Sequence, residues 1–413
     1  MSQKSTISNQ NKDTPQLRFP EFTDAWQVKK LGDVADKGEY GMNAAAKPFD
    51  GTNRYLRITD IDDQTRKIIM NGVTSPSGTL EDKYLLQWND IVFARTGAST
   101  GKTYFYNTQD GKTYFAGFLI RFRVNKATPY FVYLQTLRGP YDKWVAMVSA
   151  RSGQPGVNAE EYSTYKFYLP QKPEQQKITD FLTVVDDRIA ASEKKLELLK
   201  SYKKGVMQKI FTQVVRFKDE NGNPYPEWEK KRLGDVADFV NGYTFLSSTY
   251  VEGGKYRVIT IANVQQGAMN VDSANTIDSL PVNIQKSQIL HLGDILISMT
   301  GNVGRVCLVD AEDCLLNQRV GKLVPRDINK DYLYQCINTP RFVSKMISSG
   351  QGGAQDNLSS KDIKSYSVAL PTLEEQQKIA TFLTALDAKI AAEQTRLTAA
   401  KQWKKGLLQR MFV

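Results

Sequence analysis

Two halves of this chain carry the same sequence landmarks in the same order. The stretch Trp-Gln-Val-Lys-Lys-Leu-Gly-Asp-Val-Ala-Asp at residues 26–36 has a near-copy, Trp-Glu-Lys-Lys-Arg-Leu-Gly-Asp-Val-Ala-Asp, at residues 228–238. Leu-Pro, three further residues and Glu-Gln-Gln-Lys-Ile at 169–178 return at 370–379. Because the spacing of the landmarks shifts by only a few residues over about 200, the chain is a duplication of one structural unit.

The first part of each repeat has the pattern of a strand-rich domain. Its short apolar or aromatic runs are separated by clusters of Gly, Asn, Asp and Ser, as expected of strands joined by loops. These runs are residues 55–59, 91–94 and 113–122 in the first repeat and 256–261, 294–298 and 305–309 in the second. Residues 130–149 and 331–348 favour helices instead. The fold class expected for this part is α+β.

The second part of each repeat carries a heptad pattern. Its seam positions alternate by four and three over more than four heptads, a narrow stripe that is typical of a coiled coil. The seam consists of Ile178, Leu182, Val185, Ile189, Ser192, Leu196, Leu199, Lys203, Val206 and Ile210, and in the second repeat of Ile379, Leu383, Leu386, Ile390, Glu393, Leu397, Ala400, Lys404, Leu407 and Met411. Polar residues fall at the same steps in both repeats. An amphipathic helix packed on its own domain is the alternative source of such a stripe.

Two matching seams in one chain predict that the two helices pack on each other. A helix of roughly thirty residues or more is on the order of 50 Å long. In an antiparallel pair, the strand-rich parts would sit at opposite ends of a rigid spacer and be related by a pseudo-two-fold axis. We therefore expect two duplicated mixed α/β domains separated by two long helices that form an antiparallel coiled-coil spacer.

Charge and composition narrow the class of partner. The chain has 55 Lys and Arg against 44 Asp and Glu, and its net charge of +11 favours nucleic acid first and an anionic membrane second. Three cysteines without a Cys-x-x-Cys pair and one histidine argue against a metal site and for a reducing compartment. Residues 1–16 are predicted to be a polar, disordered tail rather than a signal peptide, and no stretch is apolar over the length of a membrane span. The sequence predicts a soluble cytoplasmic protein.

Three features that resemble catalytic or cofactor motifs fail on spacing or context. Gly-Ala-Ser-Thr-Gly-Lys-Thr at 97–103 has three residues between its glycines where a phosphate-binding P-loop has four. Asn-Pro-Tyr-Pro at 223–226 has the wrong order for the motif of amino-methyltransferases, and a plain turn is expected there. His291 has no visible nucleophile or acid partner, so a structural role is favoured. We predict no catalytic residue, no metal ligand and no cofactor in this chain.

These residues together resemble the specificity subunit of type I restriction–modification systems. The resemblance is carried by Ser-Ser-Gly to Gln at 348–355, Asn-Leu at 357–358 and Leu-Pro to Lys-Ile at 370–379, by Ser-Gly-Gln-Pro-Gly-Val-Asn at 152–158 and Leu-Pro to Lys-Ile at 169–178, and by the Leu-Gly-Asp-Val starts and the Gly-rich turns at 97–102 and 301–305. It covers nearly the whole chain after the polar tail and occurs twice in the same order.

The resemblance implies a specific organisation and set of partners. Target-recognition domains would occupy 17–170 and 213–371, each reading one half of a split site in double-stranded DNA, and spacer helices would occupy 171–212 and 372–413. The helices would dock two methyltransferase subunits, which methylate adenine with S-adenosylmethionine, and through them translocase–nuclease subunits that use ATP. These cofactors and Mg²⁺ would be held by the partners. The chain would be a non-catalytic bacterial subunit, and because its two heads align poorly, its gapped DNA site would be asymmetric.

The candidate DNA-binding residues lie in loops that mix Arg, Lys, Gln and Asn with Gly. Arginine and lysine suit guanine edges and phosphates, whereas asparagine and glutamine suit adenine. The candidates are Arg95, Lys102, Arg151, Gln154 and Asn158 in the first head, and Asn302, Arg305, Gln351, Gln355 and Asn357 in the second. A turn-stabilising or phosphate-positioning role remains open for each. For Tyr104, Tyr106, Tyr243 and Tyr250, half-buried strand positions are favoured over base contacts.

Two interpretations from other classes stay open at this point. A coiled-coil scaffold would show little salt-dependent affinity for DNA, whereas the affinity of a DNA reader falls steeply with salt. A self-sufficient methyltransferase or nuclease would modify or cut DNA without partner subunits.

Overall fold

The computed structural model describes residues 13–150, 155–350 and 357–413, so most of the predicted polar tail lies outside the described residues. Contacts divide the chain into two units: Met1–Glu193 with Thr395–Val413, and Lys194–Gln394. Each unit contains one strand-rich head, which we call the first head (residues 17–170) and the second head (residues 213–371). Each unit also contains a segment of both long helices, so neither unit is built from one repeat alone.

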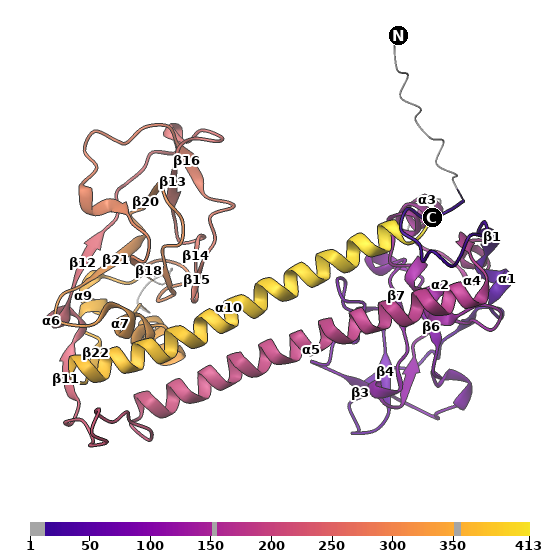
Figure 1. Ribbon diagram of the computed structural model, residues 1–413, viewed down its shortest axis with the longest axis horizontal. Helices are drawn as coiled ribbons and strands as arrows, with labels where there is room; N and C mark the ends of the chain where they lie inside the picture. Colours follow the sequence, from indigo (N-terminus) through magenta and orange to yellow (C-terminus); the bar gives the residue numbers. More distant parts are fainter. Residues whose placement is uncertain (1–12, 151–154, 351–356) are drawn as a thin grey trace, which may run out of the picture. The chain divides into compact units, whose positions relative to one another are not determined.

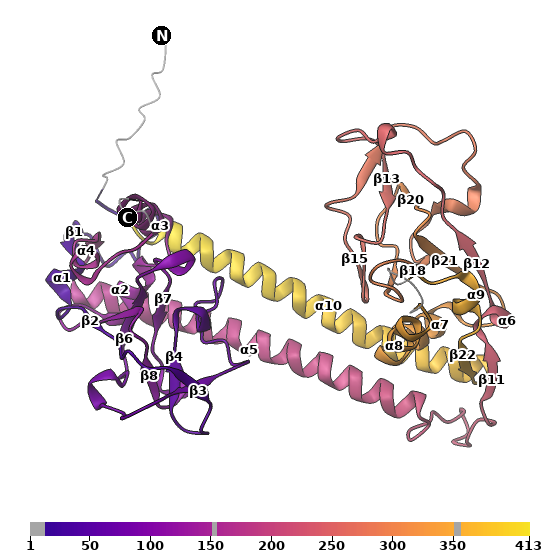
Figure 2. The ribbon, with the colours of Figure 1, turned by 180° about the vertical axis from the view of Figure 1, so that it is seen from behind.

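Both heads begin with a ribbon strand and a helical turn, continue through short strands, and end with helices and a second ribbon strand (Figures 1 and 2). The first head comprises β1 (Gln27–Lys30), α1 (Leu31–Val34), β2 (Glu39–Tyr40), β3 (Ala46–Pro48), β4 (Arg54–Leu56), β5 (Thr74–Pro76), β6 (Asp90–Ala94), β7 (Thr103–Phe105), β8 (Thr113–Phe115), β9 (Leu119–Arg123), α2 (Pro129–Gln135), α3 (Gly139–Ser149), α4 (Ala159–Ser163) and β10 (Lys166–Leu169). The second comprises β11 (Glu229–Arg232), α6 (Leu233–Val236), β12 (Ala237–Asn241), β13 (Tyr256–Ile259), β14 (Val264–Gln265), β15 (Ala268–Met269), β16 (Asn275–Ile277), β17 (Ile289–Leu290), β18 (Ile295–Ser298), β19 (Val306–Leu308), β20 (Cys314–Leu316), β21 (Val320–Pro325), α7 (Lys330–Ile337), α8 (Pro340–Gly350), α9 (Ser360–Lys364) and β22 (Ser367–Leu370).

A four-stranded antiparallel sheet forms the centre of each head. Its strand order is β2-β9-β6-β7 in the first head and β12-β21-β18-β19 in the second, so the two sheets have the same topology. Smaller sheets surround them: β3-β5 and β4-β8 in the first head, and β16-β13-β20-β17 and β14-β15 in the second. The pairs β4–β8 and β13–β20 are parallel, whereas the other pairs are antiparallel. These observations confirm the α+β class and the duplication.

In each head the first and last strands pair as a two-stranded ribbon, and a long helix follows directly after it. In the first head β1 pairs antiparallel with β10, and in the second β11 pairs antiparallel with β22. The repeated Leu-Gly-Asp-Val motif follows the first ribbon strand as a single helical turn whose Leu and Val are buried. Its aspartate caps that turn, because the Asp33 carboxylate accepts the Lys30 backbone N–H at 2.7 Å and Asp235 accepts that of Arg232 at 3.0 Å. The motif therefore has a structural role at the beginning of each head.

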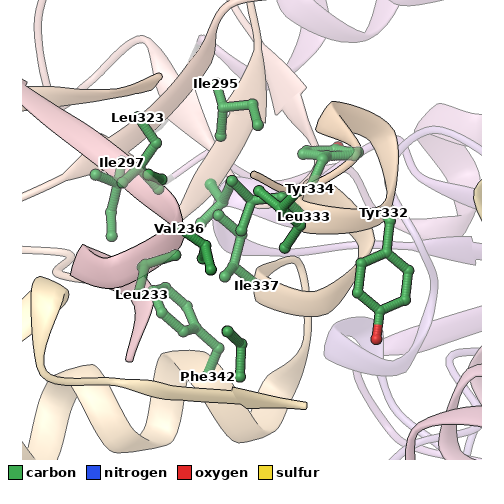
Figure 3. Packing of buried hydrophobic residues seen from close by; sticks show 14 of the residues in the cluster. Leu233, Val236, Ile295, Ile297, Leu323, Tyr332, Leu333, Tyr334, Ile337 and Phe342 are labelled. Carbon is green, nitrogen blue, oxygen red and sulfur yellow. The ribbon is translucent and has the colours of Figure 1, made fainter. Parts of the chain in front are cut away.

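The core of the second head lies between its central sheet and helices α6, α7 and α8. Ile295 and Ile297 of β18 are fully buried and pack in one cluster with Leu233 of α6, Leu333 of α7 and Phe342 of α8 (Figure 3). Each of these residues faces the cluster because the apolar positions of β18 recur at every second residue and those of the helices at helical spacing. The core thus holds the helices against one face of the sheet.

Each stretch of a head that the sequence predicts to be helical contains two helices. Residues 130–149 form α2 and α3, and residues 331–348 form α7 and α8. The break falls where proline enters the sequence, because Pro140 lies in the first turn of α3 and Pro340 begins α8. Proline cannot donate the backbone hydrogen bond that a continuous helix needs and disfavours helical geometry at the residue before it.

The two long helices are α5 (Lys172–Phe211) and α10 (Leu373–Arg410), and in each unit they pack antiparallel. In the second unit Lys195 pairs with Glu393 at 2.7 Å and Lys203 with Asp387 at 2.6 Å. In the first unit the pairs Asp186–Lys404 and Glu193–Lys401 run in the same opposed sense. Of the predicted apolar seam residues, Ile178, Leu182, Val185, Ile189, Leu196, Ile379, Leu383, Leu386 and Leu397 are buried, and Leu199 and Ile390 are half-buried.

The seam lysines Lys203 and Lys404 form equivalent ion pairs, one in each unit. The Asp387 carboxylate accepts from Lys203 with one oxygen and from the Gln335 amide of α7 at 2.7 Å with the other. Asp186 likewise accepts from Lys404 and from the Tyr130 hydroxyl of α2. Each aspartate therefore joins its own helix to its own head and to the helix of the other repeat, which accounts for a lysine in an otherwise apolar seam.

Reversing one charge of this pair is expected to destabilise the second unit. Lys203→Glu would face Asp387 with a like charge, and because Lys203 is nearly buried while Asp387 is partly exposed, we expect a loss of about 2 kcal/mol. Asp387→Lys should behave similarly, and the double exchange should recover most of the loss. Urea unfolding of all three variants gives the coupling energy. Lys200→Glu, at an exposed position of α5, is the control; equal losses for Lys200→Glu and Lys203→Glu would contradict the assignment.

Candidate nucleic-acid interface

The Gly-rich turns predicted to face DNA follow the buried central strands β6 and β18. Backbone geometry requires glycine near the end of each turn: Gly101 has φ +88° and Gly304 has φ +77°. A Cβ atom on Gly101 would also lie 2.7 Å from Cγ1 of Val145 in α3, and one on Gly304 would lie 2.6 Å from Cβ of Met346 in α8. The turns are therefore pressed against a helix of their own head, with no room for a side chain at this point.

Each Gly-rich turn is joined to a second candidate segment far along the chain. In the first head the Gly97 N–H donates to the Pro155 carbonyl at 3.1 Å, and the Val157 N–H donates to the Arg95 carbonyl at 2.9 Å. In the second head the Leu358 N–H donates to the Met299 carbonyl at 2.8 Å. One of these hydrogen bonds, from residue 157 or 358 to the residue after the central strand, is common to both heads, as are the backbone bridges Thr96–Gly156 and Thr300–Asn357.

The described candidates of the first head are engaged in contacts within the protein. The Arg95 Nε donates to the Gly117 carbonyl at 3.1 Å. Lys102 pairs with Asp63 at 2.6 Å, and its side chain is 14% exposed, so its charge is neutralised. Asn158 caps α4, since its side chain accepts the Glu161 N–H at 2.9 Å. Arg151 and Gln154 lie outside the described residues.

The candidates of the second head are more open. Arg305 donates to the Gln265 side-chain oxygen at 2.7 Å, which directs its guanidinium towards the β14–β15 hairpin. Asn302 is exposed, and its backbone carbonyl accepts from the Ser298 hydroxyl. Asn357 is exposed and forms a backbone bridge to Thr300. Gln351 and Gln355 lie outside the described residues.

The candidate tyrosines are buried or half-buried. Tyr104 and Tyr106 are buried, and their hydroxyls donate to Asp110 at 2.5 Å and to the Gly111 carbonyl at 2.9 Å. Burial raises the pKa of both hydroxyls, so both stay protonated at neutral pH. Tyr243 and Tyr250 are half-buried beside a small apolar cluster. The expectation of half-buried strand positions is thus met only in part: Tyr104 lies in β7, whereas Tyr106, Tyr243 and Tyr250 lie outside the strands.

The surface beside the turns contains residues that the sequence reasoning missed. Tyr40 and Phe118 are 44% and 56% exposed, and the Arg95 guanidinium lies over both rings at 5.1 and 5.7 Å from their centroids. Gln318 and Arg319 are exposed at the matching place of the second head. The available signal was the short interval of three residues, 116–118, between β8 and β9, which requires a tight turn next to the Gly-rich loop.

Nucleophiles and metal ligands are not gathered anywhere in the described part of the chain. Among the described residues no group of three or more His, Cys, Asp or Glu side chains could hold a metal ion. Burial raises the pKa of Cys307 to about 12 and that of Cys314 to about 11, so both thiols are protonated at neutral pH. His291 is 76% exposed, with Asp294 4.0 Å away.

Within the described ranges, no helix combines the length and the apolar character needed to cross a membrane.

A family model, curated relatives and a solved structure all match this chain over most of its length. The model of the type I restriction modification DNA specificity domain matches residues 23–201 and 225–402, one copy in each repeat. The type I restriction enzyme MjaVIII specificity subunit of Methanocaldococcus jannaschii is 24% identical over 408 residues, covering 95% of this chain and 92% of the relative. The putative MjaX specificity subunit of the same organism is 26% identical, with 94% and 93% covered. The crystal structure of the type I S subunit from M. genitalium shares the fold, with a TM-score of 0.62, 16% identity and 97% and 99% of the chains covered.

Proposed function

The chain belongs to the family of type I restriction–modification DNA specificity domains, and from this premise we propose that it selects the DNA sequence on which a type I complex acts. The observation that carries the proposal is the repeated juxtaposition of a Gly-rich turn with a second polar segment, made by the same backbone bonds in both heads. Two equivalent surfaces in one chain suit a DNA site of two parts. The relatives, too, are specificity subunits of type I restriction enzymes.

The two half-sites should differ in sequence because the two surfaces differ in chemistry. In the first head the cation that ends the Gly-rich turn, Lys102, is paired with Asp63. In the second head the equivalent Arg305 is held by the neutral Gln265 and keeps its positive charge uncompensated by this contact. Different side chains present different donors and acceptors to base edges. The proposed target is therefore bipartite, gapped and asymmetric.

The long helices are proposed to set the unread gap and to dock two methyltransferase subunits. A 40-residue helix such as α5 is about 60 Å long, which exceeds one turn of DNA, about 34–36 Å. Equivalent positions of α5 and α10 present exposed aromatic side chains, Tyr202 at 54% and Trp403 at 53%. A repeated exposed aromatic on a repeated helix supports two copies of one partner, since aromatic residues are enriched at protein interfaces. Restriction subunits would join through these partners.

The chemistry of modification and cleavage is assigned to the partner subunits. Specificity subunits are non-catalytic, and the buried, protonated thiols described above offer no nucleophile. S-adenosylmethionine, ATP and Mg²⁺ are therefore proposed to bind the methyltransferase and restriction subunits rather than this chain. The exposed polar turns supply recognition, which requires donors and acceptors but no reactive group.

Sequencing of modified adenines tests the proposal directly. The chain is expressed with its cognate methyltransferase subunit in a host without other adenine methylation, and the genome is read for methylated bases. We expect one gapped, asymmetric motif, methylated on both strands, and no methylation by either subunit alone. Exchange of the first head for another should change one half of the motif only. A stable complex that methylates nothing and shows no salt-dependent DNA affinity would overturn the proposal in favour of a scaffold.

A further inference from the structure

A tight turn beside the Gly-rich loop occupies the same place in both heads. In the first head it joins β8 to β9 through residues 116–118, and in the second it joins β20 to β21 through residues 317–319. The Arg95 N–H donates to the Phe118 carbonyl at 3.0 Å, and the Met299 N–H donates to the Arg319 carbonyl at 3.0 Å. Each turn is thus fixed to the first residue after a central strand, on the surface already described.

The other side of each turn is held by the segment that follows β2 or β12. The Gly117 N–H donates to the Met42 carbonyl at 2.8 Å, and the Gln318 N–H donates to the Tyr243 carbonyl at 2.9 Å. At this crossing the backbones come so close that a Cβ atom on Gly41 would lie 2.3 Å from the Ala116 carbonyl oxygen. The same crossing in the second head places a Gly242 Cβ at 2.0 Å from a carbonyl oxygen. Both turns are consequently rigid platforms of the same geometry.

The side chains displayed on these platforms are different in kind. The first head presents Phe118, more than half exposed, beside the Arg95 guanidinium that lies over its ring. The second head presents Gln318 and Arg319, both exposed. Among residues 155–350 and 357–413, no hydrogen bond or ion pair engages the Arg319 side chain, whereas Arg305 nearby is held by Gln265. Phe118 and Arg319 occupy the equivalent position of the two turns, and both side chains are exposed rather than packed into the core of their head.

We propose that residues 118 and 319 determine half-site specificity, Arg319 by reading a guanine and Phe118 by contacting a thymine methyl group. Arginine matches the O6 and N7 acceptors of guanine with two parallel donors, and phenylalanine offers the apolar surface that packs against the thymine C5-methyl. Because the backbone beneath each side chain is fixed from both sides, little ordering is needed on binding. This inference rests on the proposed function, since it assigns bases to the DNA surface of each head.

Methylated-motif sequencing of Arg319→Ala, Arg319→Lys and Phe118→Ala chains, each expressed with the methyltransferase subunit, tests the assignment. Arg319→Ala should leave one half of the motif unchanged and make a single G·C position of the other half degenerate, with preference for the correct base falling by about tenfold or more. Arg319→Lys keeps the charge but loses the paired donors, so it should relax the same position while retaining affinity. Phe118→Ala should relax a position in the opposite half-site.

Controls separate this inference from the proposed function. The unmodified chain must first yield a gapped motif; its absence would count against the function and not against these residues. Lys230→Ala removes one exposed positive charge from the ribbon of the second head and should leave the motif intact. The inference is overturned when Arg319→Ala and Arg319→Lys retain the original motif, with lower methylation at all sites alike, because that pattern marks a phosphate contact. Relaxation of both half-sites by one variant would overturn it as well.

Discussion

Replacing Phe412 with alanine is expected to lower the stability of the first unit by about 3–5 kcal/mol, the range found when a buried phenylalanine is truncated. Phe412 follows the end of α10 and is 3% exposed. Its ring stacks on Phe131 with centroids 5.0 Å apart and meets Trp26 edge-on at 6.2 Å. The Arg138 guanidinium lies 5.2 Å from its centroid. Alanine would leave a cavity among groups that come from the beginning and middle of the first head.

The effect of Phe412→Ala should be confined to the first unit. Hydrogen exchange is expected to show lost protection in α2 and α3 of the first head, with α7 and α8 of the second head unchanged. Phe412→Leu retains most of the apolar volume and should recover much of the stability. Tyr202→Ala removes an aromatic side chain that is 54% exposed and serves as the matched control. A loss for Phe412→Ala no larger than for Tyr202→Ala would refute a core role for the ring.

In the second unit, too, the end of a long helix contributes to the core of the head formed by the other repeat. Ile210, at the end of α5, is 1% exposed and belongs to the core of the second head, and the ring of Phe211 lies 6.1 Å from that of Tyr332. Each head is therefore completed by the helix that ends the other repeat. Neither repeat contains all the residues of its own core, although each repeat contains all its own strands. The two repeats are expected to fold as interdependent parts of one chain.

The sequence predicted those features of the fold that depend on residues close together in the chain. Spacer helices at 171–212 and 372–413 differ by one to three residues at each end from α5 and α10. Both depend on local periodicity and on Pro-containing starts, which a single sequence displays. The insertion of each helix end into the opposite head was not predicted. It depends on contacts between residues hundreds of positions apart, such as Arg138 and the Val413 carbonyl, and periodicity contains no information about them.

Sequence alone selected the loops that the structure brings together in each head, but it could not foresee how their side chains are engaged. The duplicated Gly-rich turns stand out in the sequence because glycine is required there by positive φ and close packing. Composition could not distinguish a displayed cation from a neutralised one. Lys102 is a candidate because it is a basic residue in a loop, yet its partner Asp63 comes from a distant part of the first head. Sequence alone does not single out Phe118, because an aromatic residue between two strands is usually buried, and only the fold shows that the turn exposes it.

The repeated Glu-Gln-Gln-Lys-Ile motif has a structural role that its sequence alone did not reveal. The fully buried Glu375 accepts two bonds from Arg216, at 3.3 and 2.9 Å, and one from the Trp228 indole at 2.9 Å. The next residue, Gln376, accepts the Asn329 N–H at 2.8 Å and thereby ties the start of α10 to α7. Glu174 and Arg18 form the equivalent ion pair in the first unit, at 2.7 Å. The motif fastens each long helix to its head.

Glu375→Ala is accordingly expected to destabilise the second unit by about 3–5 kcal/mol, because it leaves the mostly buried Arg216 and the Trp228 indole without their shared acceptor. Glu374→Ala removes the exposed neighbouring carboxylate and should change stability by less than about 0.5 kcal/mol. Glu375→Gln can still accept but carries no charge, so an intermediate loss is expected. Urea unfolding measures all three variants. The methylated motif should stay the same in Glu375→Ala chains that remain folded, because the carboxylate positions a helix and contacts no base; an altered motif would place Glu375 in recognition instead.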